Sequence, residues 1–168
     1  NLVITAGSDL AIKNCFELLV RKNSEVITIF PTYGMVDAYC KLFQAKQIKI
    51  NYKKNLKISV DDLLKKITKK TSLVVVANPN SPTGTIFSEK DIRRLLQKTK
   101  KNSAYFLLDE CYNGYYEKTY IRLINKFKNL IITRSFSKIG MAGSRVGYIV
   151  SSRDNIERLL KFRPMYEI

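Results

Sequence analysis

The sequence contains no histidine, few cysteines and no long hydrophobic run, and each absence excludes a class of function. Without histidine, neither a histidine-based catalytic triad nor a histidine-liganded metal centre can form, and we expect no metal site. The three cysteines form no CxxC pair, so we expect free thiols that mostly fill the core of a cytoplasmic protein. No apolar run approaches the ~18 residues of a membrane-spanning helix, so we expect no membrane partner.

The length of 168 residues suffices to bury the core of one domain, and 45% of the residues are hydrophobic. No linker, internal repeat or low-complexity segment interrupts the chain, so a single domain over residues 1–168 is expected. The first residues, "NLVIT", lack an initiating methionine and resemble a strand in the middle of a fold. We therefore expect the chain to be part of a longer protein.

The net charge of +16 is the compositional feature that suggests a nucleic-acid partner. The lysines lie mainly in "KKITKK" (65–70) and "QKTKK" (97–101). Such clusters are typical of solvated helix ends, where lysine suits the negative end of the helix dipole. No aromatic residues interleave with them to stack on bases. We therefore expect no nucleic-acid partner, while a basic nucleic-acid-binding α/β module without a cofactor stays open as an alternative.

Short apolar runs alternate with helical patterns along the chain. Several runs lack polar alternation, which indicates strands buried on both faces, as in a parallel sheet covered by helices. Amphipathic helices are predicted over 9–22, 59–67 and 88–96, the last two beginning at capping serines Ser59 and Ser88. The pattern predicts a three-layer α/β/α fold with a mostly parallel seven-stranded sheet. Its strands are expected over 2–5, 26–30, 48–52, 73–77, 104–109, 129–133 and 146–150.

Loops rich in polar residues, glycine or proline follow five of these strands. Because ligands bind at the carboxyl ends of the strands in such sheets, the five loops should converge on one site. Their sequences are "AGSD" (6–9), "PTYG" (31–34), "NPNSPTG" (78–84), "ECY" (110–112) and "SFSKIGMAGSR" (135–145).

The first and last of these loops suggest a phosphate site. The "AGSD" loop opens a helix with Ser8 or Asp9 expected at its N-cap, and such a helix end attracts phosphate, although for this loop taken alone ordinary capping is the favoured explanation. In the last loop, two serines accompany Lys138 and Arg145, and arginine binds phosphate oxygens bidentately. A lysine held near a phosphate and a carbonyl can form a Schiff base if its pKa is lowered.

Asp109 ends an apolar strand, where a lone carboxylate is costly unless a cation lies against it. A protonated ring nitrogen would serve, and so would a structural arginine or lysine. The "NPNSPTG" loop is either a rigid turn or an anchor for a hydroxyl or a ring oxygen.

Taken together, "GSD", "PTYGM", "NPNSPTG", "DECY" and "SFSKIGMAGSRVGY" resemble the large domain of fold-type I pyridoxal-phosphate-dependent aminotransferases of class I/II. The resemblance runs from about residue 2 to 165 and points to the histidinol-phosphate aminotransferase branch. It implies pyridoxal 5′-phosphate as the cofactor, a small-molecule amino donor, a keto-acid acceptor and a homodimer. The N-terminal segment and the small C-terminal domain of the family are expected to be absent, the latter beginning near "RPMYEI". Alone, the chain should then bind cofactor with weak or no transamination.

The resemblance also implies roles for individual residues. Lys138 would form the Schiff base and move a proton between the substrate and the cofactor. Asp109 would pair with the ring nitrogen, Tyr112 would bind the ring 3′-oxygen, and Tyr33 would stack on the ring. The phosphate would be surrounded by Ser8, Asp9, Ser135, Ser137 and Arg145.

One position departs from the family pattern. Most relatives have asparagine immediately before the "PTG" proline, contacting the 3′-oxygen, whereas this chain has Ser81 there and Asn80 before it. We assign the contact to Asn80, with Ser81 as the alternative. A second reaction also remains open, because relatives on this scaffold decarboxylate phosphorylated amino acids with the same cofactor.

Overall fold

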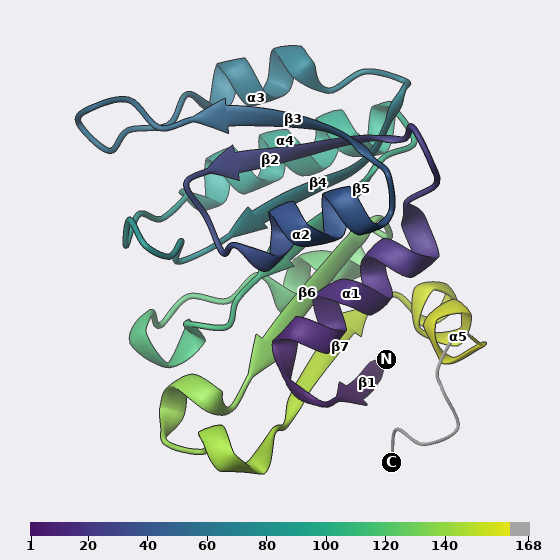
Figure 1. The fold of residues 1–168 in the computed structure, drawn as a ribbon, viewed down its shortest axis with the longest axis vertical. Coiled ribbons are helices and arrows are strands. Elements are labelled where there is room, and N and C mark those ends of the chain that lie inside the picture. Colours follow the sequence, from purple (N-terminus) through teal and green to yellow (C-terminus); the bar gives the residue numbers. More distant parts are fainter. Residues whose placement is uncertain (162–168) are drawn as a thin grey trace.

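The computed structural model describes residues 1–161, so the predicted domain end at "RPMYEI" lies outside the described residues. One seven-stranded sheet runs through the molecule in the order β1-β7-β6-β5-β4-β2-β3 (Figure 1). Its strands are β1 (Leu2–Thr5), β2 (Glu25–Phe30), β3 (Lys46–Asn51), β4 (Thr71–Ala77), β5 (Tyr105–Asp109), β6 (Leu130–Ser135) and β7 (Gly147–Ser151). The helices are α1 (Gly7–Leu19), α2 (Met35–Leu42), α3 (Val60–Lys66), α4 (Glu89–Lys101) and α5 (Arg153–Lys161).

Strands β3, β2, β4, β5 and β6 are mutually parallel, which confirms the mostly parallel sheet expected from the sequence. Strand β7 runs antiparallel to both of its neighbours, β6 and β1. In the pair of β7 with β1, Leu2 lies opposite Val150, so the first and last strands along the described chain pair directly.

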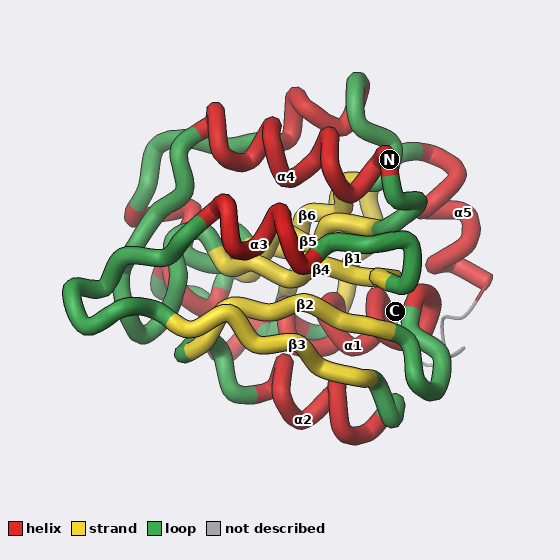
Figure 2. Tube along the Cα trace, turned by 90° about the horizontal axis from the view of Figure 1, so that it is seen from above, coloured by secondary structure: helices red, strands yellow, loops and turns green. Residues whose placement is uncertain are grey.

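Helices cover both faces of the sheet and give the three layers (Figure 2). Alternate residues of the central strands enter opposite cores, as the two-residue period of a strand requires. Val74 and Val76 pack with α3 and α4, whereas Leu73 and Val75 pack with α1, α2 and α5. The expected burial of both faces is therefore confirmed.

The helix ends agree with the sequence at two positions and disagree at one. Ser59 and Ser88 cap α3 and α4, each accepting a hydrogen bond of 3.1 Å from the backbone N–H three residues later. The expectation that Ser8 or Asp9 caps the first helix was wrong, because α1 begins at Gly7 and its N-cap is Ala6. No described helix is long and apolar enough to cross a membrane.

The early start of α1 has a steric cause. Gly7 has a φ of +85°, a conformation that glycine adopts without strain, and it lies directly against Gly147 at the start of β7. A Cβ on Gly147 would lie 2.3 Å from the carbonyl carbon of Gly7 and 2.5 Å from the backbone nitrogen of Ser8. This backbone contact holds the N-terminus of α1 against the sheet edge.

We therefore expect Gly147→Ala to lower the free energy of unfolding by about 1–3 kcal/mol, because the atoms it would strike are backbone atoms that cannot turn away. Denaturant unfolding of the purified chain measures the change. Gly143→Ala is the matched control, since nothing lies within 4 Å of its Cβ position. Equal stability of the two variants would contradict the steric explanation.

Candidate active site

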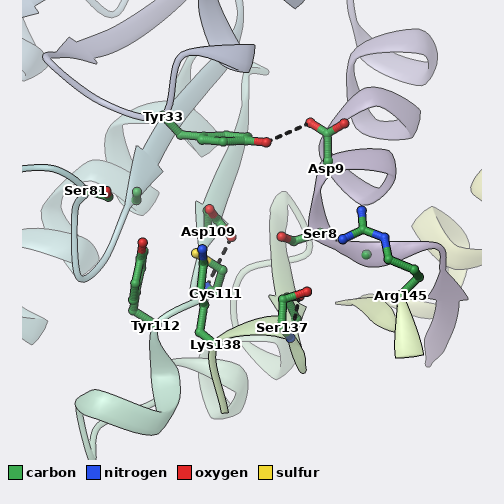
Figure 3. Close-up of a pocket in the computed structure, with 13 residues that line it drawn as sticks. Ser8, Asp9, Tyr33, Ser81, Asp109, Cys111, Tyr112, Ser137, Lys138 and Arg145 are labelled. Atoms are coloured by element: carbon green, nitrogen blue, oxygen red, sulfur yellow. Dashed lines mark hydrogen bonds between the residues drawn. The ribbon is translucent and has the colours of Figure 1, made fainter. Parts of the chain in front are cut away.

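A pocket of about 160 Å³ lies at the carboxyl ends of the parallel strands, beside the N-terminus of α1 (Figure 3). The space exceeds that of a few water molecules and admits a small organic ligand. Nine of the ten residues predicted for the site line this pocket, which confirms the predicted convergence of the loops. They are Ser8, Asp9, Tyr33, Asp109, Tyr112, Ser135, Ser137, Lys138 and Arg145.

Asp109 lies at the inner end of the pocket with its side chain buried. Its Oδ1 accepts hydrogen bonds from the Thr133 hydroxyl at 2.9 Å and from the Cys111 backbone N–H at 3.2 Å. Among residues 1–161 it has no ion-pair partner. Burial raises the pKa of Asp109 to about 6, although the hydrogen bonds from Thr133 and Cys111 favour the ionised form. A cation placed against Asp109 would therefore favour its ionised form.

The other end of the pocket is rich in hydrogen-bond donors and carries positive charge. The Arg145 guanidinium lies against Gly7, at the point where the helix begins, with Nη2 3.5 Å from the Cβ position of that glycine. Arg145 makes no ion pair with any described residue. The first turn of α1 has no side-chain cap within the described chain, so its backbone N–H groups remain available. An anion is favoured here by charge and by the helix dipole.

Two serines complete this donor-rich end. The Ser135 hydroxyl, at the end of β6, donates to the Ser137 hydroxyl at 2.9 Å and accepts from the Ser137 backbone N–H at 3.1 Å. This local turn aims both side chains into the pocket, as Figure 3 shows for Ser137. Ser8 reaches the same space from α1.

Lys138 follows directly, in a 3₁₀ turn formed by residues Ser137–Ile139. Its Nζ lies 5.5 Å from the centroid of the Tyr112 ring, within the range of a cation–π contact. In Figure 3 the Lys138 side chain extends into the pocket beside Asp109 and Cys111. The pocket therefore holds an amine beside a buried carboxylate, and its other end is rich in hydrogen-bond donors.

Tyr33 covers the opposite side of the pocket with its ring (Figure 3). Its hydroxyl donates to Asp9 Oδ1 at 3.3 Å. Burial, followed by the charge of Asp9, raises the pKa of Tyr33, so the hydroxyl keeps its proton and remains a donor. The carboxylate of Asp9 is thus directed at a tyrosine, and a nearby anion would be repelled by it. Of the polar groups of Asp9, only the backbone N–H therefore suits an anion at this end.

Asn80 is the predicted residue that does not line the pocket. Its amide is buried between its own loop and the loop after β2, where Oδ1 accepts from Thr32 at 2.7 Å and Nδ2 donates to Pro31 O and, within its own loop, to Thr83 Oγ1. Ser81, the alternative from the sequence, does line the pocket. The sequence alone does not show which of these two neighbours faces the pocket, because the directions of adjacent loop side chains depend on the folded shape of the loop.

The structure adds residues that sequence analysis missed, namely Gly7, Ala77 and Cys111. Cys111 was expected to be a core thiol like Cys15 and Cys40, and it is indeed buried, yet it also faces the pocket. Its position in the sequence between Asp109 and Tyr112, both of them predicted site residues, was the feature that could have indicated this. Burial raises the pKa of the Cys111 thiol, with the charge of Asp109 adding to the effect, so it stays protonated.

Comparisons with known proteins give a consistent result. The family model for "Aminotransferase class I and II" matches residues 1–166. The histidinol-phosphate aminotransferase of Methanococcus aeolicus is 32% identical to this chain over all of its length, which corresponds to 46% of that protein. The chain thus spans about half the length of the curated relatives it matches.

Solved structures share the fold. The histidinol-phosphate aminotransferase of Clostridium acetobutylicum superposes with a TM-score of 0.88 at 20% identity, covering 99% of this chain and 50% of that one. A PLP-dependent aminotransferase from Streptococcus suis gives a TM-score of 0.87 at 22% identity, covering 96% and 44%. At these identities the likeness establishes the architecture alone.

The raised pKa of Asp109 predicts how stability depends on pH. Between pH 3.8 and about pH 6, the Asp109 carboxyl binds more protons in the folded state than in the unfolded state. The free energy of unfolding therefore falls as the pH rises through this interval. Asp109→Asn, which stays uncharged, should therefore raise the free energy of unfolding of the ligand-free protein at pH 8. The gain should be roughly 2–3 kcal/mol, from about two pKa units at about 1.4 kcal/mol each.

Urea unfolding at pH 8 and at pH 3.5 measures this effect, and the gain should nearly disappear at the lower pH, where the aspartate is protonated in the folded chain and mostly protonated in the unfolded chain. The exposed substitution Glu117→Gln is the control and should leave the free energy of unfolding unchanged at pH 8. An Asp109→Asn protein no more stable than wild type at pH 8 would contradict the prediction.

Proposed function

The chain belongs to the class I and II aminotransferase family, and on that premise we propose that it forms the cofactor-binding large domain of a pyridoxal-phosphate-dependent aminotransferase. Enzymes of this family use pyridoxal 5′-phosphate. We place the chain in the histidinol-phosphate aminotransferase-like group. The whole protein would transfer an amino group between an amino acid or amino-phosphate compound and a keto acid.

The single observation that carries the proposal is the distribution of charge along the pocket. Asp109 is a buried carboxylate, Arg145 is a cation at the opposite end, and neither has an ion-pair partner among the described residues. A ligand that matches both ends carries a protonated nitrogen at one end and a phosphate at the other. Pyridoxal phosphate has this polarity, so the residues present fit the cofactor.

Each pocket residue then has a physical task. Asp109 would accept a hydrogen bond from the ring nitrogen and keep a proton there, because the ion pair relieves the cost of burying the carboxylate. Tyr112 would donate its hydroxyl to the ring 3′-oxygen. Tyr33 would lie on the ring face, held by its hydrogen bond to Asp9.

The phosphate would be bound without any need for the Asp9 carboxylate. Arg145 supplies the charge, the backbone N–H groups of the first turn of α1 supply directed donors, and three hydroxyl groups complete the set. Those hydroxyls belong to Ser8, Ser135 and Ser137. Near the 3′-oxygen we propose Ser81 as the contact, with Asn80 shaping the loop through its own hydrogen bonds.

Bound cofactor supplies an electron-withdrawing ring that makes a proton on the substrate Cα labile. Lys138 would attach the cofactor by condensation of its amine with the aldehyde, releasing water. When a substrate amine displaces it, the freed Nζ would carry the proton between the substrate Cα and the cofactor C4′. The neighbouring Tyr112 ring, 5.5 Å from Nζ, would limit where the amine can move.

For the whole protein we also propose a homodimer in the cytoplasm, by analogy with the family. Incubation of that protein with amino acids and a keto acid tests the type of reaction. A new keto acid indicates transamination, and carbon dioxide without a keto acid would overturn it in favour of decarboxylation.

Lys138→Ala should abolish the covalent attachment of the cofactor, because the amine that condenses with the aldehyde is removed. Wild-type chain incubated with pyridoxal phosphate and reduced with borohydride should gain the mass of one cofactor, less the water lost in the condensation and plus the two hydrogens added by the reduction, and peptide mass spectrometry should locate the adduct on Lys138. The variant should show no such gain.

Lys126→Ala, at an exposed lysine outside the pocket, is the control and should retain the adduct. An adduct of unchanged stoichiometry in Lys138→Ala would mean that another lysine carries the cofactor, and the assignment would fail.

A further inference from the structure

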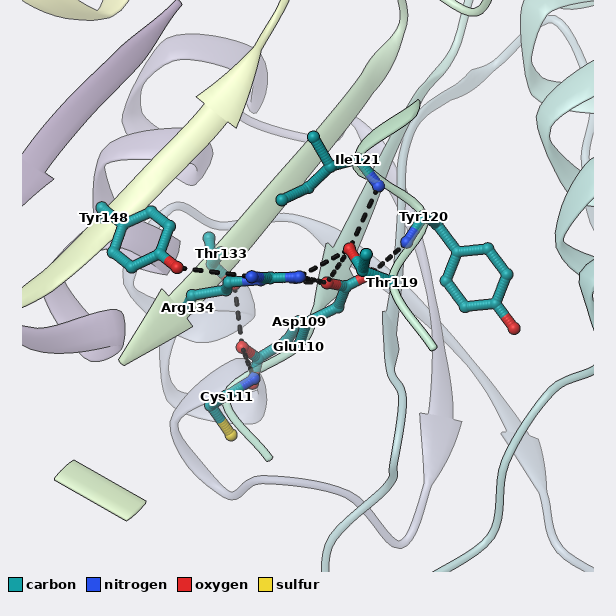
Figure 4. Close-up of polar contacts among 9 residues, drawn as sticks. All are labelled: Asp109, Glu110, Cys111, Thr119, Tyr120, Ile121, Thr133, Arg134 and Tyr148. Atoms are coloured by element: carbon teal, nitrogen blue, oxygen red, sulfur yellow. Dashed lines mark hydrogen bonds and ion pairs between the residues drawn. The ribbon is translucent and has the colours of Figure 1, made fainter. Parts of the chain in front are cut away.

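Two acidic residues follow one another at the end of β5, and they have opposite environments. Asp109 faces the pocket without an ion-pair partner among the described residues, whereas Glu110 is buried on the other side of the sheet and accepts several hydrogen bonds. Its Oε2 accepts from Arg134 Nε at 3.0 Å and from Arg134 Nη2 at 2.7 Å (Figure 4). The exposed fractions of the two side chains are 1% for Glu110 and 12% for Arg134, so water contributes little to their solvation.

This ion pair joins the two strands that carry the main candidate residues. Glu110 comes one residue after Asp109, and Arg134 comes one residue before Ser135 and four before Lys138. The backbone N–H of Glu110 donates to Thr133 O at 2.8 Å, the last backbone bond between the ends of β5 and β6. The side-chain pair continues the connection where that ladder ends.

The same carboxylate also closes the loop that carries Tyr112. Glu110 Oε1 accepts from the Tyr120 backbone N–H at 2.9 Å, and Oε2 accepts from the Thr119 hydroxyl at 3.0 Å. The loop therefore begins at Glu110 along the chain and returns to it in space. Arg134 contacts Thr119 as well, at 2.5 Å, and reaches the Tyr148 hydroxyl of β7 at 3.4 Å (Figure 4).

We propose that Glu110 and Arg134 are a positioning pair that sets the placement of Asp109, Tyr112 and Lys138 relative to one another around the cofactor. The inference rests on the proposed function and assigns roles to two residues that do not line the pocket. Geometry supports it, because the pair fixes β5, β6 and both ends of the Tyr112 loop at a single point. Such placement matters, since displacing reacting groups by about 1 Å can cost on the order of 100-fold in rate.

Electrostatics also favour a compensated pair at this place. The negative charge of Glu110 is among the causes that raise the pKa of the adjacent Asp109, after burial. Arg134 neutralises that charge on the far side of the sheet from the pocket. The carboxylate can thus organise the loop while adding little to the cost of keeping Asp109 ionised.

Glu110→Gln and Arg134→Gln each remove one charge of the pair and should weaken cofactor binding about tenfold, the lower end of the range for contacts that orient ligand-holding groups. Absorbance titration of the folded chain with pyridoxal phosphate measures the Kd. Glu157→Gln is the matched control, because it breaks an ion pair with Arg153 of 2.8 Å whose side chains are 56% and 80% exposed. The control should remain within about twofold of wild type.

A second readout separates positioning from folding. The pH midpoint of the visible absorption change, recorded at saturating cofactor, should shift in Glu110→Gln and Arg134→Gln, because the groups around Lys138 and the ring have moved. It should stay unchanged in Glu157→Gln. A pair that only stabilises the fold would lower the thermal midpoint and leave both the Kd and the pH midpoint of the folded protein unaltered. That result would overturn the proposal.

If either single variant fails to fold, the double variant Glu110→Gln/Arg134→Gln replaces it, since it leaves no unpaired charge buried. Hydrogen exchange of the cofactor-free chain adds an arm that does not need the cofactor. Faster exchange confined to residues 111–121 and 133–138 supports the positioning pair, and uniformly faster exchange overturns it. A wild-type chain that binds no pyridoxal phosphate would overturn the proposed function alone, since the exchange result stands without it.

Discussion

The buried carboxylate of Asp109 is the constraint on which the rest of the site depends. A carboxylate in this position is stable as an anion only if charge or hydrogen bonds compensate for lost hydration. The sheet provides two hydrogen bonds, from Thr133 and from the Cys111 backbone, and burial still raises the pKa to about 6. Asp109 has no ion-pair partner among the described residues, so a positive charge placed directly against it would compensate the remaining cost of burial.

The period of a β-strand explains why Asp109 and Glu110 have such different environments. Successive side chains of β5 point to opposite faces, so one acid reaches the pocket and the next reaches the layer of α3 and α4. The same alternation holds in β6, where Thr133 and Ser135 share the face of Asp109, and Arg134 shares that of Glu110. One face lines the pocket, and the other carries the ion pair between the ends of the two strands.

Sequence reasoning predicted the sheet and most pocket residues because these depend on local signals. Uninterrupted apolar runs marked the strands, and Ser59 and Ser88 marked helix starts that the structure confirms. It named no helix over Met35–Leu42 or Arg153–Lys161, and the first of these begins after Gly34 without a capping side chain. The start of α1 depends on the contact between Gly7 and Gly147, which no local pattern contains. The Glu110–Arg134 pair likewise joins residues from different strands.

The pairing of β1 with β7 has a consequence for how the chain reaches its folded state. Leu2 finds its strand partner, Val150, near the other end of the described chain, and the sheet offers β1 no second neighbour. Such distant contacts carry a high loop-closure entropy and form late. During synthesis, β1 must therefore wait for β7 before it can pair. The central parallel strands can assemble earlier, and the anion-binding end of the pocket, which needs Arg145 beside Gly7, is completed only when synthesis has passed β7.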